Sequence, residues 1–215
     1  MAASGAVCVA ELGILGGTFN PPHVAHLVMA QEALDQLDLD RVLLMPANEP
    51  PHKAIEDDPG PEVRADLCRL AVAGDTRFEV SRLEIERGGA SYTADTLREL
   101  HARHPEHELT FIVGGDMAHG LPAWREPEAI LRLARLAVAE REELRREDLA
   151  RRLAPLHEGN RVVFFAMPRI DVSSSAIRDR VARGHPVRYL VPDAVADAIA
   201  RDRLYRHPAA GRPAA

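Results

Sequence analysis

The sequence contains little cysteine. Cys8 and Cys68 are the only two cysteines in 215 residues, and they show neither metal-binding nor redox spacing. Both are expected to be small buried hydrophobic residues in a reducing compartment, for which the cytoplasm is the simplest assignment. A disulfide scaffold is thereby excluded.

Long apolar runs and basic runs are also missing. No hydrophobic stretch approaches the roughly 20 residues needed to span a bilayer, and the first residues lack the basic segment of a secretory signal. The formal net charge of −6 is spread along the chain, so no basic stripe is available to neutralise the phosphates of a polynucleotide. Neither a membrane nor a long nucleic acid is expected as a partner.

The composition is that of a globular protein, with 46% hydrophobic and 28% charged residues. Short apolar runs alternate with segments in which apolar residues recur every three to four positions. This pattern predicts an α/β fold with a doubly wound, mainly parallel sheet of Rossmann-like type. Strands are expected at 7–15, 41–45, 78–81, 109–113, 134–139 and 161–166, and helices at 24–37, 61–73, 93–104, 141–152, 175–183 and 192–201.

The organisation along the chain predicts one domain over residues 1–206, followed by a disordered tail at 207–215. The proline-rich stretch 47–61 is expected to be a mobile loop. The charged helix at 141–152 is expected to form a solvated outer face. A homo-oligomer is compatible with the sequence, which does not indicate its size.

The segment GGTFNPPHVAHL, from Gly16 to Leu27, follows the first predicted strand, at the sheet edge where open α/β sheets bind ligands. Gly16 and Gly17 would form a turn that lets the backbone approach a ligand, and the next helix aims free N–H groups at an anion. His23 and His26 share one face of the first helical turn. Chance placement would account for either element alone, but the complete segment predicts a phosphate site.

A second segment, VSSSAIR, places Ser173, Ser174 and Ser175 before a helix that carries Ile177 and Arg178. Serine is a preferred N-cap residue, so a capped helix is the simpler explanation. The same hydroxyl, N–H and guanidinium groups can also bind phosphate oxygens. Together the two segments predict the two halves of a triphosphate site.

Both segments resemble signatures of the nucleotidyltransferase superfamily, G-G-T-F-D-P-x-H-x-G-H and I-S-S-T-x-I-R. Pantetheine-phosphate adenylyltransferases, one branch, are shorter and usually carry threonine at the position of His23. Other segments resemble the bacterial nicotinate-nucleotide adenylyltransferases, in order along nearly the whole chain. These are EPPHK at 49–53, SYTADTL at 91–97, GGD at 114–116, LPAW at 121–124, YLVP at 189–192 and a late LY at 204–205.

The resemblance implies a nucleotidyltransferase fold and an enzyme of NAD biosynthesis. Such an enzyme transfers the adenylyl group of ATP to nicotinate mononucleotide and releases pyrophosphate. The resemblance assigns catalytic roles to His23, His26 and Arg178. The residues expected to bind ATP are Gly16, Gly17, Thr18, Phe19, His23, His26, Gly114, Asp116, Ser173, Ser174, Ser175, Ile177 and Arg178.

The mononucleotide is expected to contact a second set of residues: Lys53, Tyr92, Thr93, Trp124 and Arg125. Within this set, the resemblance implies that Tyr92 and Trp124 pack against the pyridine ring. Backbone N–H groups around Thr93 and Arg125 would bind the nicotinate carboxylate. An isolated core or surface tryptophan is the alternative for Trp124.

The sequence departs from the family signatures at several positions. Asn20 stands where aspartate is usual, Ala25 where glycine is usual and Ser175 where threonine is usual. The Ala25 methyl group is expected to alter the shape of the nucleotide pocket. Residues 139–141 read AER instead of R-P-G, so Arg141 receives no role.

The implied reaction needs no protein nucleophile. The substrate's own phosphate, with a second pKa of about 6, is mostly dianionic at neutral pH and can attack the α-phosphorus directly. Mg²⁺ is expected as the cofactor, bound to the ATP phosphates, because it prefers phosphate oxygens and water to an all-protein cage. No dedicated protein metal site is expected.

Two other functions remain open. The enzyme could prefer nicotinamide mononucleotide or accept both substrates, and a nucleotide-binding regulator could keep the fold without catalysis. His101, His104 and His107 are spaced three apart, but Pro105 interrupts the helix between them. A solvated helix end is therefore expected there in preference to a metal site.

Overall fold

The computed structural model describes residues 10–51, 54–140, 146–156 and 161–206. A six-stranded sheet in the order β3-β2-β1-β4-β5-β6 forms its centre, and every neighbouring pair of strands is parallel. The strands are β1 (Glu11–Gly17), β2 (Arg41–Pro46), β3 (Phe78–Val80), β4 (Glu108–Gly114), β5 (Arg135–Glu140) and β6 (Val162–Ala166). The predicted doubly wound parallel sheet is confirmed, and its strand order reverses between β1 and β4.

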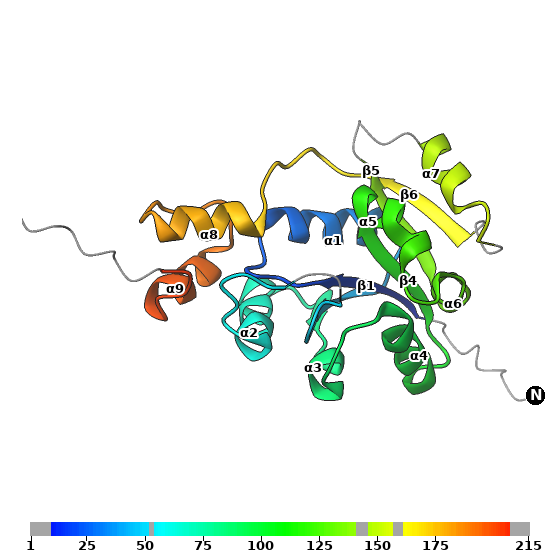
Figure 1. Cartoon of the computed structure of the whole chain (residues 1–215), viewed down its shortest axis with the longest axis horizontal. Helices are drawn as coiled ribbons and strands as arrows, with labels where there is room; N and C mark the ends of the chain where they lie inside the picture. The colour runs from blue at the N-terminus through cyan, green and yellow to red at the C-terminus, as the bar shows by residue number, and fades with distance from the viewer. Residues whose placement is uncertain (1–9, 52–53, 141–145, 157–160, 207–215) are drawn as a thin grey trace, which may run out of the picture.

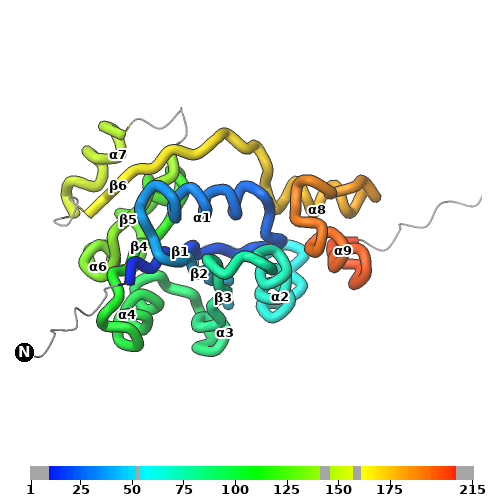
Figure 2. Tube along the Cα trace, turned by 180° about the vertical axis from the view of Figure 1, so that it is seen from behind, coloured from blue at the N-terminus to red at the C-terminus, as the bar shows by residue number. Residues whose placement is uncertain are grey.

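Helices cover both faces of this sheet (Figures 1 and 2). Their apolar sides form separate core clusters, with Ala30 and Leu34 of α1 in one and Leu97 and Leu100 of α4 in another. The helices are α1 (Val24–Gln36), α2 (Pro61–Ala71), α3 (Leu83–Arg87), α4 (Thr93–Arg103), α5 (Gly115–Gly120), α6 (Pro127–Leu133), α7 (Arg146–Leu153), α8 (Ser174–Ala182) and α9 (Asp193–Arg201), with a 3₁₀ turn η1 (Leu121–Ala123). None of the helices in the described ranges is long and apolar enough to cross a membrane.

Helices α8 and α9 stand beyond the carboxyl end of β1, at one end of the molecule (Figure 1). Ile177 of α8 and Ile199 of α9 pack with Leu67 of α2 in a third core cluster. The backbone N–H of Val24, at the start of α1, also donates to the carbonyl of Leu190 (3.0 Å). These contacts bring the start of α8 to the start of α1, although about 150 residues separate them in the sequence.

The first predicted strand was placed too early. In the structure β1 runs from Glu11 to Gly17, and residues 7–9 lie outside the described ranges. Gly16 and Gly17 are therefore not the turn: they pair with Met45 and Pro46 of β2 as the last residues of the strand. A Cβ on Gly17 would lie 3.1 Å from the Phe19 ring, so any larger residue there would press on this buried ring.

The charged helix was also only partly predicted. Its described part is α7, and it is amphipathic: Leu149 and Leu153 are each 1% exposed and belong to the core. The expected solvated outer face is present, because residues 146–148 and 150–152 are exposed. The two leucines, four residues apart, form an inner side of the helix that the sequence analysis did not describe. The predicted tail at 207–215 and the role of Arg141 fall outside the described residues. The single domain stays a prediction.

Candidate active site

The turn between β1 and α1 has an unusual backbone. Phe19 adopts a positive φ of 50°, which non-glycine residues rarely do. Its ring is 1% exposed and packs edge-on against the His26 imidazole, with centroids 4.9 Å apart. Such strained residues persist where the surrounding structure holds them and are concentrated at functional sites. Phe19 was predicted to contact ATP, but its side chain is buried, so only its backbone can face a ligand.

His23 and His26 come together as the spacing predicted. His23 is the N-cap residue of α1, and the two imidazole rings are stacked with centroids 3.7 Å apart. The backbone N–H of His23 donates to Nδ1 of His26 (3.2 Å). Because Nδ1 of His26 accepts this bond, Nε2 carries the proton and remains a donor.

The pKa of His26 lies well below its ordinary value, first because burial penalises the charged ring and second because His23 adds like charge. His26 is thus a neutral donor at neutral pH. It can donate a hydrogen bond to a phosphate oxygen, whereas the positive charge at the site must come from another residue.

The second predicted segment lies directly opposite. Ser173 is the N-cap of α8, and its hydroxyl accepts a hydrogen bond from the backbone N–H of Ala176 (3.2 Å). The Ser174 hydroxyl donates to the carbonyl of Pro21 (2.9 Å), and Arg178 donates to the carbonyl of Asn20 (3.1 Å). The two segments are therefore joined by hydrogen bonds as well as by packing.

These segments enclose a cavity of about 540 Å³, a size typical of small-molecule sites. Ala25, which replaces the usual glycine of the family signature, lies in the wall of this cavity. Ile177 does not line the cavity, because its side chain is 0% exposed and lies in the core. Ile177 was expected to bind ATP, and its burial leaves only its backbone for that role. The lining residues are Thr18, Asn20, His23, Ala25, His26, Met29, Ala54, Ile55, Glu56, Val172, Ser173, Ser174, Ser175 and Arg178.

Arg178 supplies positive charge to this cavity. Its side chain is only 12% exposed, and it lies 3.7 Å from carboxylate oxygens of both Glu56 and Asp57. The side-chain amide of Asn20, another departure, donates to the carbonyl of Glu56 (2.9 Å). The loop after β2 thus covers one side of the cavity and faces Arg178 with two acidic groups.

Arg64 supports this site and was not predicted. It is 0% exposed, and its guanidinium donates to the carbonyls of Thr18, Ala47 and Asn48 at 2.7–3.0 Å and to the Asp58 carboxylate at 2.9 Å. One buried side chain therefore ties the β1–α1 turn to the loop after β2. A lone arginine in an amphipathic helix carries no sequence signal for this role.

The Gly114–Asp116 turn lies at the carboxyl end of β4, next to β1 in the sheet. A Cβ on Gly114 would lie 3.7 Å from Cε of Met29, which lines the cavity. Asp116 is exposed in the first turn of α5. The turn therefore lies next to Met29 in the cavity wall, but none of its own residues is among the described residues that line the cavity. Its contact to the nucleotide stays a prediction.

The residues expected to bind the mononucleotide form a separate group outside this cavity. The Arg125 guanidinium lies 4.6 Å from the centroid of the Tyr92 ring, and its NH1 atom lies 3.3 Å from the Asp95 carboxylate. Trp124 packs edge-on against Phe111, with centroids 6.2 Å apart, and is partly buried against the core. Lys53, also in the predicted set, lies outside the described residues.

Thr93 begins α4, as predicted. Among the described residues its backbone N–H has no hydrogen-bond acceptor, as the geometry of a first helical residue dictates. The second predicted carboxylate-binding segment, around Arg125, also lies at a helix start. Glu126, which directly follows Arg125, is the N-cap residue of α6 and has a positive φ of 56°. Both predicted carboxylate-binding segments are thus backbone turns at helix starts.

Glu84 anchors the start of α4 and was missed by the sequence analysis. It is 7% exposed, and it accepts a hydrogen bond from the Thr96 hydroxyl (2.6 Å), which also accepts one from Arg87 (2.9 Å). Burial raises the pKa of Glu84, and hydrogen bonds from Thr96 and Ser91 oppose that rise. Glu84 therefore fixes the helix that presents the Thr93 N–H.

The lowered pKa of His26 predicts a pH-dependent stability. Below its ordinary value of 6.5, the unfolded chain takes up a proton that the folded protein resists, so the free energy of unfolding falls as the pH decreases toward the lowered pKa. Urea unfolding at about pH 7.5 and about pH 5.5 should show a larger loss for the wild type than for His26→Gln. Equal losses in both proteins would contradict the buried neutral state.

Comparison with known proteins defines the family. The model of the cytidylyltransferase-like family matches residues 14–180, which include both signature segments. A protein of Roseiflexus sp. (strain RS-1) is 45% identical over 199 residues, covering 92% of this chain and 98% of that protein. A protein of Citrifermentans bemidjiense is 44% identical over 212 residues, covering 91% of this chain and 98% of that protein. Both are named probable nicotinate-nucleotide adenylyltransferase. This chain belongs to that family.

A solved structure has the same fold. The nicotinic acid mononucleotide adenylyltransferase of Plasmodium falciparum, complexed with APC, superposes with a TM-score of 0.74 over 91% of this chain and 97% of that chain, at 16% identity. The same enzyme complexed with NaAD matches equally well. The Rossmann-like nucleotidyltransferase fold implied by the resemblance is confirmed.

Proposed function

We propose that this protein transfers the adenylyl group of ATP to nicotinate mononucleotide, giving nicotinate adenine dinucleotide and pyrophosphate for NAD biosynthesis. The observation that carries the proposal is the single cavity formed by the starts of α1 and α8, which gathers His23, His26, Ser174 and Arg178. Family membership supports the choice of substrates, because the relatives are named for nicotinate nucleotide.

The triphosphate is assigned to this cavity by its donors. Two helix starts, α1 and α8, provide free backbone N–H groups and the positive ends of two helix dipoles. Arg178 adds a guanidinium that can bind two phosphate oxygens, and His26 adds a neutral N–H donor. Bound phosphates would replace Glu56 and Asp57 as the groups facing Arg178.

The chemical step needs positioning and charge stabilisation. A phosphate oxygen of the mononucleotide attacks the α-phosphorus of ATP, forming one P–O bond while the bond to the β-phosphate oxygen breaks. The bonding electrons leave with pyrophosphate, and no proton has to move. His23, His26 and Arg178 would stabilise the charge that develops on the transferring and leaving oxygens.

The donor set of the cavity suits an anion better than a bare metal ion. Histidine, serine, threonine and arginine account for most of the polar residues in its lining, and the Glu56 carboxylate faces Arg178. Mg²⁺ would therefore be held by the ATP phosphates, where it offsets their negative charge. Thr18 and Ser174 would then contact phosphate oxygens directly.

The mononucleotide is assigned to the group around the starts of α4 and α6. Thr93 and Arg125 would offer backbone N–H groups to the nicotinate carboxylate, and Tyr92 and Trp124 would pack against the pyridine ring. The Arg125 guanidinium covers the Tyr92 ring, so a pyridine ring packing on the same face would require the guanidinium to move aside. Lys53 would bind phosphate from the loop after β2.

Pyrophosphate release, coupled to product identification by mass spectrometry, tests this function. ATP with nicotinate mononucleotide should give equal amounts of pyrophosphate and nicotinate adenine dinucleotide. Arg178→Gln should lower the rate sharply, whereas Arg180→Gln, on the same helix with its guanidinium on the Pro186 carbonyl, is the matched control. Faster turnover with nicotinamide mononucleotide would support the amide-preferring alternative, and nucleotide binding without product would support the regulator.

Trp124 offers a test of the mononucleotide site. Trp124→Ala should raise the KM for the mononucleotide by about 2- to 12-fold, because ring stacking contributes about 0.5–1.5 kcal/mol. The KM for ATP should change little. Trp124→Phe, which keeps an aromatic ring against Phe111, should retain most of the affinity. Equal effects on both substrates would mean that Trp124 has only a structural role.

A further inference from the structure

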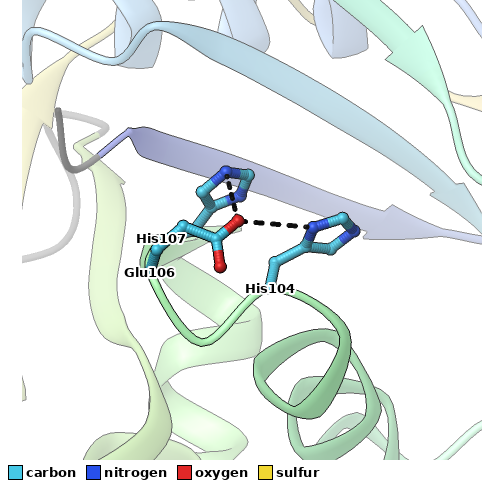
Figure 3. Close-up of side chains that lie close together, drawn as sticks. All are labelled: His104, Glu106 and His107. Atoms are coloured by element: carbon cyan, nitrogen blue, oxygen red, sulfur yellow. Dashed lines mark ion pairs between the residues drawn. The ribbon is translucent and has the colours of Figure 1, made fainter. Parts of the chain in front are cut away.

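A group of potential metal ligands lies outside the candidate active site, in the turn between α4 and β4. His104, Glu106 and His107 each point one ligand atom toward the other two, and these three atoms all lie within 4.8 Å of one another. Figure 3 shows the Glu106 carboxylate between the two imidazole rings. Pro105 explains this convergence, because it ends the helix and turns the chain back on itself.

The turn holds the ligands in place through its backbone. His104 is the residue after the last turn of α4, and its carbonyl accepts a hydrogen bond from the backbone N–H of His107 (3.1 Å). The two rings are nearly parallel, with an interplanar angle of 6° and centroids 5.0 Å apart. Nδ1 of His107 is buried, which leaves Nε2 as the nitrogen that faces Glu106.

The spacing is close to that of a zinc site. A tetrahedral ion with ligands at about 2.0–2.1 Å separates neighbouring ligand atoms by about 3.3–3.4 Å. Nε2 of His107 lies 3.4 Å from Oε1 of Glu106, and Nδ1 of His104 lies 3.8 Å from the same oxygen. The latter distance is too long for a hydrogen bond. The two imidazole nitrogens lie within 4.8 Å of each other, and the rings are nearly parallel. The exposed side chains of His104 and Glu106 must therefore rotate before all three ligand atoms reach zinc spacing.

We propose that His104, Glu106 and His107 form a binding site for a divalent transition-metal ion, with Zn²⁺ as the best match. Two imidazoles and one carboxylate are a donor set that suits zinc, and the exposed position leaves a fourth place for water. Mg²⁺ is a poor match because it prefers oxygen ligands. The ion would link the end of α4 to the start of β4.

This site is separate from the proposed ATP site. Residues 104–107 precede β4, whereas the cavity borders its carboxyl end, and the seven residues of β4 span about 20 Å. The inference therefore does not rest on the proposed function. Loss of the metal site should leave the rate of adenylyl transfer, measured without added Zn²⁺, within about twofold of the wild-type rate.

Isothermal titration of the full chain with Zn²⁺ alone tests the proposal. The wild type should bind one more equivalent than the double variant His104→Gln/His107→Gln, which keeps any other Zn²⁺ site, including one at His23 and His26. Glu106→Gln should weaken binding to this site by at least about tenfold. His101→Gln is the matched control, one helical turn earlier and outside the group, and should bind as the wild type does.

Thermal unfolding gives an independent readout of the same site. At about 100-fold excess of Zn²⁺ over its dissociation constant, the wild type should unfold about 5–10 °C higher than without the ion, and the double variant should lose this shift. Circular dichroism should show the same fold for both. Equal Zn²⁺ stoichiometry and equal shifts in the wild type and the double variant would overturn the proposal.

Discussion

Replacing His23 or His26 by alanine is expected to lower kcat by on the order of 10²-fold or more while the protein stays folded. Both rings lie at the start of α1, stacked 3.7 Å apart, in the wall of the cavity that would hold the triphosphate. Each substitution removes a group positioned to stabilise charge that is larger in the transition state than in the bound substrates. Such a loss affects kcat more than KM.

The control must separate catalysis from the capping of α1. His23 is the N-cap residue, and asparagine is a preferred residue at that position, so His23→Asn should keep the helix start while still losing most of the activity. His101→Ala, on the exposed side of α4, should behave as the wild type in the same assay. Near-normal turnover of His23→Ala and His26→Ala, with unchanged circular dichroism, would rule out the assigned roles.

Selectivity for the acid over the amide is the second large expected effect. The kcat/KM for nicotinate mononucleotide should exceed that for nicotinamide mononucleotide by on the order of 10²-fold or more. The Thr93 N–H lies at the start of an 11-residue helix and has no acceptor among the described residues. A carboxylate at a helix start gains only about 0.3–1 kcal/mol from the dipole, so the dipole alone gives a few-fold preference.

The larger contribution comes from hydrogen bonding. An amide would turn its NH₂ group toward backbone N–H groups that cannot accept a bond, and each opposed donor costs about 1–3 kcal/mol. Two such donors, near Thr93 and Arg125, account for the expected ratio. Steady-state kinetics with both mononucleotides measures it directly. Comparable kcat/KM values would show that the carboxylate site was wrongly assigned and would place the protein with dual-specificity or amide-preferring enzymes.

A variant of the buried network can locate the source of this selectivity. Thr96→Val removes the hydroxyl that joins Glu84 to α4, and it leaves Thr93 itself unchanged. If the position of the helix start sets the preference, the ratio of kcat/KM values for the two mononucleotides should fall. The KM for ATP should stay nearly constant.

The parallel sheet could be predicted because its strands are short, apolar and separated by amphipathic helices. The two segments proposed to bind phosphate were recognisable for a similar reason: each combines glycine or serine with a helix start. Their meeting could not be derived from either segment alone. It depends on α8 and α9 packing against α2, through Ile177, Ile199 and Leu67. The phosphate-type donors shared by the two segments pointed to this meeting, and so did the family resemblance.

Other parts of the structure carry no sequence signal. Helices α3, α5 and α6 have five, six and seven residues, too few for a helical period to stand out. Arg64 and Glu84 look like ordinary surface charges of amphipathic segments. Arg64 is buried by the β1–α1 turn and the loop after β2, and Glu84 is hydrogen-bonded to Thr96 in the first turns of α4. Pro105 was correctly expected to interrupt the helix, but the turn that it creates brings His104 and His107 together.

The starts of α1 and α8, about 150 residues apart in the sequence, are proposed to form one triphosphate site. A crystal structure with a non-hydrolysable ATP analogue tests it most directly. We expect the triphosphate in the cavity of about 540 Å³, with phosphate oxygens at hydrogen-bond distance from His26 and Arg178 and with Glu56 displaced from Arg178. A triphosphate bound elsewhere, with Glu56 and Asp57 still facing Arg178, would contradict the account.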